Sequence, residues 1–533
     1  MTVPSGSAAP AGARFVLDPA FEVGAVDPRL FGSFVEHLGR CVYTGLYEPG
    51  HPAADEDGVR ADVLDLVREL GVTAVRYPGG NFVSGYKWED GVGPREARPR
   101  RLDPAWRTLE TNEFGLAEFV RALAKVPGAE PMLAVNLGTR GAAEAMELLE
   151  YANHPGGTEL SDLRAAHGDR APYRIKLWCL GNEMDGDWQI GRKDAREYGR
   201  LAANTAKAMR LIDPDIELIA CGSSGRSMAT FGAWEATVLD EAFDLVDYIS
   251  MHAYYEERDG DRDSFLASAL DMEAFIEGVV ATCDHVAAKR RSPKKIKISF
   301  DEWNVWYMSR GVEPQDADGA DDGGWPRAPR LLEDVYSVTD AVVVGSLLIT
   351  LLRHADRVAV ACLAQLVNVI APIMTEPGGP AWRQTTFFPF AQAARYARGA
   401  RVLQVNVECP TYPTKLHGDA PLVHATAVRD DAGAVTVFAV NRSRHAPLPL
   451  HVELRGTGVA GVIEHCVLAD EDPDAKNTLA EPERVAPSTV RGATRSGSDG
   501  RGRAGRRLGR AAGEFAAVVM ECDPSGGRIG RKM

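Results

Sequence analysis

Short apolar runs alternate with longer amphipathic stretches between residues 30 and 400. Eight apolar runs predict strands, at 30–37, 73–79, 131–138, 175–183, 216–223, 246–254, 295–303 and 357–365. Between them, apolar residues recur three or four positions apart, which predicts helices near 56–70, 112–126, 141–153, 194–212, 229–244, 265–290, 329–353 and 382–398. Apolar strands that alternate with helices are typical of a parallel sheet covered on both faces. Eight such repeats favour a closed (β/α)8 TIM barrel over an open sheet.

The pattern changes after residue 400, where short strands follow one another without long helices. In 448–454, apolar side chains alternate with proline and polar residues, which is typical of a half-buried antiparallel sheet. We therefore predict a jelly-roll-like β-sandwich at 401–490, behind a catalytic barrel at 28–400. A strand at 15–27 should join the sandwich, and residues 1–14 should be a flexible N-terminus.

The last segment, residues 491–533, has a different composition from the rest of the chain. It holds nine Arg and one Lys against two Asp and two Glu, in an Arg/Gly-rich sequence. This composition favours a solvated basic tail over a nucleic-acid-binding arm. Only residues 514–522 are apolar enough to contribute a strand.

The composition and charge narrow the class of protein. Hydrophobic residues make up 45% and charged residues 25% of the chain, as in ordinary soluble globular proteins. The formal net charge of −15 argues against nucleic acid or an anionic membrane as a partner. The longest apolar stretch, 341–352, is shorter than the roughly 20 residues that span a bilayer, and predicts a buried helix.

Two further features predict a cytoplasmic protein. The eight cysteines form no C-x-x-C pair, and several lie in apolar runs, which suits a reducing compartment better than a disulfide framework. The first fifteen residues lack a basic start followed by an apolar segment, so we expect no secretion signal.

Two glutamates mark the candidate chemistry. Glu183 ends the fourth predicted strand and Glu302 the seventh, and catalytic groups of a barrel lie at the carboxyl ends of its strands. Two carboxylates in one barrel mouth can hydrolyse a glycosidic bond, one as acid and the other as nucleophile or base. Two exposed loop acids are the alternative, but both residues follow apolar strands and have polar and aromatic neighbours. The histidines lack H-E-x-x-H or comparable spacing, so we expect neither metal nor cofactor.

Long motifs in a fixed order carry a family resemblance. They are FGSFVEHLGRCVYTGLYEP, RYPGGNFVSGYKWEDGVGP, NLGTRG, GNEMDGDWQIG, HAYY, DEWNVWY, LAQLVNVIAPIMTE and DPDAKNT. With them the chain resembles the family 51 glycoside hydrolases, which are α-L-arabinofuranosidases with catalytic acids on barrel strands four and seven. The resemblance implies that Glu183 is the acid/base and Glu302 the nucleophile of a retaining, exo-acting enzyme. It also implies arabinan or arabinoxylan oligosaccharides as substrates and a homo-oligomer, commonly a hexamer.

The resemblance extends to the residues around the two acids. It implies sugar contacts or pocket positions for Glu36, Asn81, Asn182, His252, Tyr254, Gln365, Trp106 and Trp306. It also implies that Arg76 faces the carboxylate of Glu302 and keeps it ionised. Simpler structural roles stay open: Arg76 as an ordinary buried ion-pair partner, His252 as a core histidine, and the two Trp as core side chains. The Gly79–Gly80 pair predicts a tight turn beside Asn81 rather than a phosphate loop.

Two other functions remain open at this point. The same acid pair could serve a β-xylosidase or an endoglucanase, because the shape of the pocket selects the sugar. A non-catalytic carbohydrate-binding protein is the second alternative, although binding alone requires neither acid. The Arg/Gly-rich tail departs from the family pattern, in which the sandwich ends with a regular strand.

Overall fold

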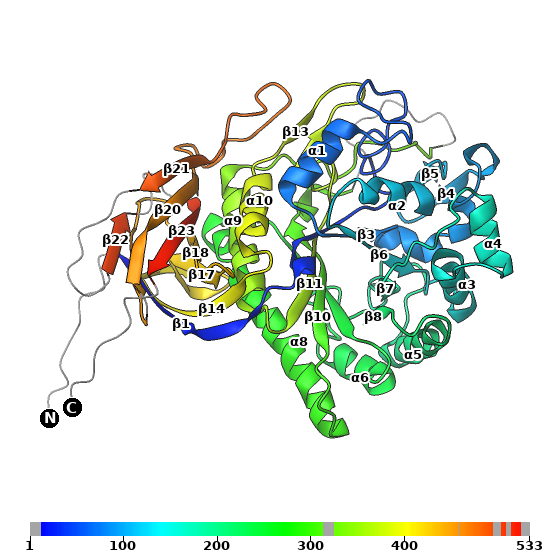
Figure 1. Ribbon diagram of the computed structural model, residues 1–533, viewed down its shortest axis with the longest axis horizontal. Helices are drawn as coiled ribbons and strands as arrows, with labels where there is room; N and C mark the ends of the chain where they lie inside the picture. The colour runs from blue at the N-terminus through cyan, green and yellow to red at the C-terminus, as the bar shows by residue number, and fades with distance from the viewer. Residues whose placement is uncertain (1–11, 313–323, 457, 494–502, 508–512, 524–533) are drawn as a thin grey trace.

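The computed structural model describes residues 12–312, 324–456, 458–493, 503–507 and 513–523. Eight of the described strands close into a parallel barrel (Figure 1). They are β2 (Gly32–Phe34), β3 (Ala74–Tyr77), β6 (Glu130–Val135), β7 (Leu177–Leu180), β8 (Glu217–Ala220), β9 (Tyr248–Tyr255), β10 (Lys297–Val305) and β11 (Val358–Leu363). Each overlaps one of the eight predicted runs, so the predicted TIM barrel is confirmed. Residues 1–11 of the predicted flexible N-terminus lie outside the described residues.

Helices cover the outside of the barrel (Figure 1). They are α1 (Ala61–Leu70), α2 (Leu116–Ala124), α3 (Ala142–Asn153), α4 (Glu159–Ala166), α5 (Ala195–Ile212), α6 (Ala233–Ala242), α7 (Arg262–Leu266), α8 (Ala269–Arg290), α9 (Val338–Arg353) and α10 (Phe387–Ala397). The helix predicted at 329–353 begins at Val338 instead, because Ser337 and Asp340 form a capping box there. Helix α4 was not predicted, since its eight residues are mostly polar and show little periodicity.

Helix α9 lies between the barrel and a C-terminal sheet. Its residues from Val338 to Leu352 are all buried, as predicted for this apolar stretch. At Gly345 the helix meets Phe515 of the sheet so closely that an added Cβ would lie 2.4 Å from the phenyl ring. Glycine at this position therefore allows the sheet to pack against the helix. None of the described helices combines the length and the apolar composition that crossing a bilayer requires.

Nine described strands, eight of them C-terminal, form one mostly antiparallel sheet in the order β21-β20-β23-β18-β17-β14-β1-β19-β22, while β15 (Thr411–Thr414) and β16 (Gly418–Pro421) pair separately. The strands of the sheet are β1 (Ala13–Ala25), β14 (Arg401–Glu408), β17 (Val423–Arg429), β18 (Val435–Asn441), β19 (Pro449–Leu454), β20 (Gly458–Leu468), β21 (Ser488–Ala493), β22 (Arg503–Arg507) and β23 (Glu514–Asp523). Alternate residues of β18 face two cores: Phe438 joins the barrel core, while Val437 and Ala439 join a second core within the sheet. The strand from the N-terminal region, β1, pairs with both β14 and β19.

The sheet extends past the predicted boundary at residue 490. Strand β21 crosses that boundary, and both β22 and β23 come from the segment predicted as a basic tail. Strand β23 lies inside the sheet between β18 and β20, and its Phe515 and Ala516 are buried. The Arg/Gly-rich sequence around β22 lacks the apolar alternation of a half-buried strand, which is why the pattern did not predict it.

Deleting residues 513–533 is therefore expected to unfold the sheet domain. The deletion exposes the edges of β18 and β20 and removes several buried side chains, of which Phe515 alone is worth about 3–5 kcal/mol. Thermal unfolding followed by circular dichroism should show loss of the cooperative transition or a Tm lower by more than about 10 °C. A chain ended after Asp523 keeps every described strand and is the matched control. Equal Tm values for the two truncated chains would contradict the structural role of β23.

Candidate active site

The predicted site residues lie at one end of the barrel. Arg76 is on β3, Glu302 is on β10, and Glu183 lies three residues after the end of β7. His252 and Tyr254 lie on β9, while Glu36 follows β2 and Gln365 follows β11. Because all barrel strands are parallel, their carboxyl ends meet at the same rim and bring these side chains together.

The two candidate catalytic carboxylates are close neighbours. One oxygen of Glu183 and one oxygen of Glu302 lie within 4.8 Å of each other. Both residues are buried, with 9% and 6% of their surface exposed. Retaining glycosidases hold their carboxyl groups about 5–5.5 Å apart, whereas inverting enzymes need about 6.5–9.5 Å to admit a water. The spacing therefore matches the retaining arrangement.

Glu302 is surrounded by donors that stabilise its negative charge. Arg76 Nη1 donates to Glu302 Oε1 at 2.6 Å, and the hydroxyl of Tyr254 donates to Oε2 at 2.7 Å. The second terminal nitrogen of Arg76 donates to Asn182 Oδ1 at 2.7 Å, so one buried guanidinium orients both side chains. Charge-assisted hydrogen bonds of this kind fix the position of a carboxylate.

Glu183 has a different environment. Its Oε1 accepts a hydrogen bond from His252 Nδ1 at 2.8 Å, and its Oε2 accepts one from Trp188 Nε1 at 2.6 Å. Burial raises the pKa of Glu183, and the hydrogen bond from His252 opposes that rise only in part. A carboxyl group with a raised pKa keeps its proton closer to neutral pH, as a general acid requires. Trp188 was not predicted as a site residue, although it stands five residues after Glu183 in the GNEMDGDW motif.

His252 connects three carboxylates. Its Nε2 lies 3.1 Å from Asp301 Oδ1, and its Nδ1 lies 3.6 Å from Glu302 Oε2 as well as binding Glu183. Burial alone would lower the pKa of His252, but the charge of Glu302 and the hydrogen bonds to Asp301 and Glu183 raise it to about 10. The protonated ring donates from both nitrogens. Glu183, His252 and Glu302 therefore form a buried ion-paired network.

Asp301 is a buried neighbour of the site that the sequence pattern did not predict. Consecutive residues of a regular strand point to opposite faces, so Asp301 and Glu302 should not share a site. The pairing of β10 with β9 shifts register between Ser299 and Glu302, and this irregularity accompanies the burial of both acidic side chains. Such a shift leaves no signal in the sequence pattern.

Glu36 forms a second centre at the same rim. Its carboxylate accepts hydrogen bonds from the backbone N–H of Phe82 at 2.9 Å, from Trp106 Nε1 at 2.8 Å and from Gln365 Nε2 at 3.1 Å. Burial raises the pKa of Glu36 to about 8. All three neighbouring donors converge on this carboxylate, so its position is set by three separate segments of the barrel rim.

The Gly79–Gly80 pair brings the backbone close to Glu36 and Glu302. Gly79 has φ +155°, and a Cβ there would lie 2.6 Å from Glu36 Cγ. A Cβ on Gly80 would lie 3.1 Å from Glu302 Oε1 and 3.2 Å from Glu36 Oε2. The backbone at this pair bends close to both carboxylates, where a side chain would not fit, and leads directly into Asn81.

The remaining predicted residues complete the rim. Asn182 Nδ2 donates to Asn81 Oδ1 at 3.4 Å, which links the β3 and β7 ends. Trp306 packs edge-on against Tyr254 with ring centroids 5.1 Å apart. Trp106 and Trp306 are both half-buried, so each presents part of its ring at the surface. Every predicted site residue is therefore connected to Glu36, Glu183 or Glu302, directly or through one neighbour, except Asn81, which reaches Glu302 through Asn182 and Arg76.

Comparison with known proteins places this geometry in a family. Residues 66–271 match the α-L-arabinofuranosidase 1 domain, and residues 301–501 match the α-L-arabinofuranosidase C-terminal domain. The chain is 72% identical over 481 residues to an intracellular exo-α-(1→5)-L-arabinofuranosidase of Streptomyces lividans, covering 90% of this chain and 72% of that protein. It is 58% identical over 478 residues to an exo-α-(1→6)-L-arabinofuranosidase of Bifidobacterium longum, covering 89% and 91% of the two chains.

Solved structures agree with these sequence matches. A family 51 α-L-arabinofuranosidase from Bifidobacterium longum superimposes with a TM-score of 0.89 at 48% identity, covering 96% of this chain and 99% of that chain. An α-L-arabinofuranosidase from Thermotoga maritima, solved as an arabinose complex, superimposes with a TM-score of 0.82 at 32% identity, covering 96% and 100%. From its barrel, its paired acids and these relatives, the chain belongs to the α-L-arabinofuranosidases of glycoside hydrolase family 51.

Proposed function

We propose that this protein is a retaining, exo-acting α-L-arabinofuranosidase that removes terminal non-reducing α-L-arabinofuranosyl residues from arabinan and arabinoxylan oligosaccharides. The observation that carries the proposal is the buried pair Glu183 and Glu302, with carboxylate oxygens within 4.8 Å. The names of the relatives, which describe exo-arabinofuranosidases, support the choice of sugar.

The first step of the reaction forms a bond to Glu302. One of its carboxylate oxygens attacks the anomeric carbon, and the bond from that carbon to the glycosidic oxygen breaks with its electron pair. Glu183 gives its proton to the departing oxygen, so the leaving group departs as a neutral alcohol. The result is a covalent arabinosyl-enzyme and an ionised Glu183.

The second step reverses these roles. Glu183 takes a proton from a water molecule, whose oxygen attacks the anomeric carbon and displaces Glu302. Two inversions at the same carbon give net retention of configuration. Arg76 and Tyr254 donate to Glu302 and stabilise the charge that returns to it as the bond breaks.

The other rim residues are proposed to bind the sugar. Hydrogen-bonding groups around the acid pair can hold the arabinose hydroxyls, from Glu36, Asn81, Asn182 and Gln365. Trp106 and Trp306 offer partly exposed indole rings against which a sugar face can stack. His252 holds Glu183 in place through its hydrogen bond at 2.8 Å.

A panel of aryl glycosides tests the proposal. The α-L-arabinofuranoside should be hydrolysed with a kcat/KM at least about 10³-fold above those of the β-D-xylopyranoside and the β-cellobioside, because a site that pairs with each hydroxyl rejects mismatched sugars strongly. Nuclear magnetic resonance of the first product should show the α-anomer. Faster hydrolysis of the xyloside would identify a β-xylosidase instead, and faster hydrolysis of the cellobioside would identify an endoglucanase. Binding of arabinose oligosaccharides without any turnover would identify a carbohydrate-binding protein.

We also propose that the protein acts in the cytoplasm as a homo-oligomer, with a hexamer as the expected size. Relatives named intracellular support the location, and the family resemblance supports the assembly. Light scattering coupled to size-exclusion chromatography should give a mass several times the 57.6 kDa of one chain. A mass of one chain at micromolar concentration would contradict the assembly.

Replacing Trp188 by Phe is expected to move the pH profile rather than abolish turnover. The indole N–H stabilises the charged form of Glu183, so its loss raises the pKa of Glu183 further. Glu183 must be protonated for the first step, and the basic limb of the kcat/KM profile should therefore shift to higher pH. Because one hydrogen bond is worth about 1 kcal/mol, kcat/KM at neutral pH should fall less than about tenfold. A basic limb that stays in place or moves to lower pH would contradict the contact.

A further inference from the structure

Three segments of the proposed site meet at His37. His37 directly follows Glu36, and its Nε2 lies 2.9 Å from the hydroxyl of Tyr77, at the end of β3 beside Arg76. Its Nδ1 lies 2.9 Å from Glu110 Oε2. Glu110 ends β5 (Thr108–Glu110), whose hairpin partner is β4 (Arg101–Asp103).

The contact between His37 and Glu110 is sealed from solvent. Their side chains are 1% and 7% exposed. Glu110 also accepts hydrogen bonds from the hydroxyl of Tyr43 and from the backbone N–H of Asn112, the latter at 2.6 Å. Burial alone would raise the pKa of Glu110, but the adjacent His37 ring and the hydrogen bonds from Tyr43 and Asn112 outweigh burial and leave the pKa lowered. In such a setting an ionised carboxylate holds its partners strongly.

The same hairpin delivers Trp106 to Glu36. Trp106 lies in the turn between β4 and β5, where Asp103 accepts the backbone N–H groups of Ala105 at 3.0 Å and Trp106 at 3.3 Å. From this turn the indole N–H reaches Glu36 Oε1 at 2.8 Å. His37 thus fixes the backbone of Glu36, and Trp106 fixes its carboxylate. Glu110 contacts His37 and ends the hairpin that carries Trp106, so both connections lead to Glu110.

We propose that Glu110 is a positioning residue for the carboxylate of Glu36, acting through His37 and through the hairpin that carries Trp106. It thereby sets how tightly the site holds the arabinofuranosyl ring. The inference rests on the proposed function, in which Glu36 binds a hydroxyl of the sugar. Among the described residues, the side-chain partners of Glu110 include neither Glu183 nor Glu302.

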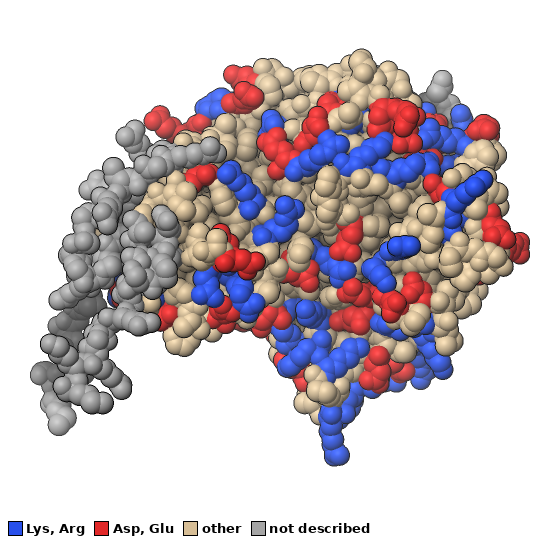
Figure 2. Space-filling model, viewed as in Figure 1, with Lys and Arg blue, Asp and Glu red and all other residues tan. Residues whose placement is uncertain are grey.

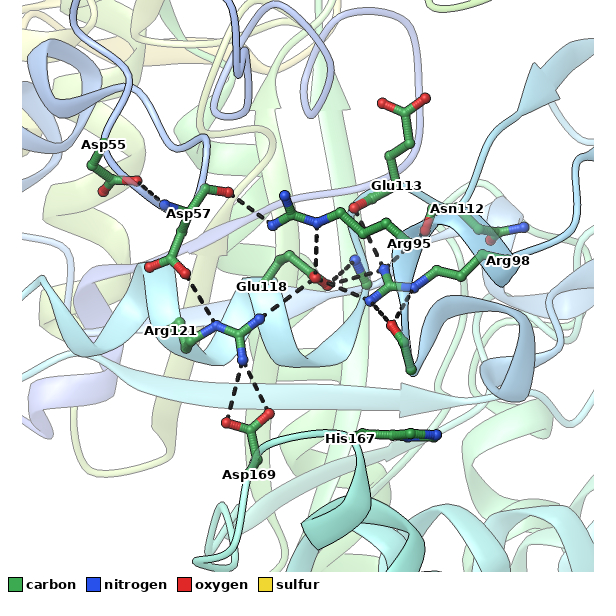
Figure 3. A network of polar contacts seen from close by, with 12 residues as sticks. Asp55, Asp57, Arg95, Arg98, Asn112, Glu113, Glu118, Arg121, His167 and Asp169 are labelled. Atoms are coloured by element: carbon green, nitrogen blue, oxygen red, sulfur yellow. Dashed lines mark hydrogen bonds and ion pairs between the residues drawn. The ribbon is translucent and has the colours of Figure 1, made fainter.

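A second buried glutamate, Glu118, binds two residues that precede the β4–β5 hairpin, and it supplies a matched control. Glu118, on α2, accepts hydrogen bonds from Arg98 at 3.0 Å, from Arg95 at 3.3 Å and from the backbone N–H of Gly115 at 3.0 Å (Figure 3). The network in Figure 3 continues through Arg121 to acidic residues of two other loops. Among the described residues, the partners of Glu118 include neither Glu36 nor His37 nor Trp106.

Charged side chains are spread over the face of the molecule shown in Figure 2, with both signs interspersed. Surface ion pairs of this kind contribute little each, whereas the pair of His37 and Glu110 is buried. A substitution at Glu110 is therefore expected to reach the site through its buried contacts rather than through the surface charge.

A double-mutant cycle tests the inference in the full-length chain. Glu110→Gln should lower kcat/KM for an aryl α-L-arabinofuranoside by about 10–100-fold, mainly through KM, and Glu36→Gln should lower it further. If Glu110 acts only through Glu36, the double variant should match Glu36→Gln within about twofold, because coupled residues are not additive. Glu118→Gln should lower Tm while keeping kcat/KM within about twofold of wild type.

The outcomes separate the inference from the proposed function. Losses that multiply in the double variant, or a Glu110→Gln variant with wild-type kcat/KM, would overturn the inference while the arabinofuranosidase activity stands. A wild-type chain without activity on the arabinofuranoside would overturn the proposed function itself. If Glu110→Gln does not fold, His37→Gln replaces it in the same double-mutant cycle with Glu36→Gln. Losses of kcat/KM that multiply in that double variant would likewise reject the inference.

Discussion

Glu302→Ala is expected to lower turnover of every arabinofuranoside by at least about 10⁴-fold. Without this carboxylate no covalent arabinosyl-enzyme can form, and no other described acid is held by both Arg76 and Tyr254. Steady-state kinetics on an aryl arabinofuranoside measure the loss. Equal losses are expected for aryl and natural substrates, because the missing step does not depend on the leaving group.

The substitution also removes one of the two carboxylates that pair with the buried Arg76 and leaves only Asp301, 3.6 Å from its Nε, which is destabilising in itself. Glu333→Ala is the matched control, since it removes the carboxylate from a comparably buried pair with Arg40, with side chains 4% and 5% exposed. This control should lose stability but retain turnover. If Glu302→Ala keeps more than about 1% of wild-type kcat while folded, Glu302 is not the nucleophile.

Glu183→Ala is expected to separate the two steps of the reaction. An activated aryl leaving group departs without a proton, so arabinosylation stays fast, whereas hydrolysis of the intermediate loses its general base. The result is a burst of released phenol followed by a slow steady state, with kcat lower by about 10²–10⁴-fold. Natural oligosaccharides should lose far more activity, because their leaving groups need the proton of Glu183.

Azide supplies the diagnostic measurement for the same variant. The anion needs no base, so it should accelerate the slow phase and yield an arabinosyl azide of retained configuration. The parent enzyme, whose second step already has its base, serves as the control and should show little response. Absence of a burst, absence of azide rescue and equal losses on aryl and natural substrates would together reject Glu183 as acid/base and make Glu36 the next acid to test.

The barrel could be predicted from the sequence because its strands are buried on both faces. Continuous apolar runs such as 216–223 and 357–365, separated by amphipathic helices, are compatible with few architectures besides a parallel sheet covered by helices. Helix α4 is short and polar, and strand β22 consists of RAGRR. Neither carries the periodicity on which such predictions depend, so neither could be predicted.

The residues of the candidate site also differ in whether they could be predicted from the sequence. Glu183 and Glu302 could be predicted because each ends a predicted apolar strand, and Glu36 and Gln365 because family motifs contain them. Asp301 could not, since its burial beside Glu302 accompanies a register shift within β10. The contact of Glu110 with the residue after Glu36 could not either, because 73 residues separate the two partners along the chain and only the folded hairpin brings them together.

The position of β23 has a consequence for how the molecule is made. The sheet contains the first and the last described strands, and β1 pairs with β14 across nearly four hundred residues. Strand β23 fits between two strands that precede it, so β18 and β20 remain unpaired on those edges until it arrives. Contacts between residues this distant in sequence form late in folding. Until they form, the unpaired strand edges promote aggregation. On the ribosome, the barrel can therefore assemble before the sheet closes, and stalled synthesis before residue 514 should yield an insoluble nascent chain rather than a smaller working enzyme.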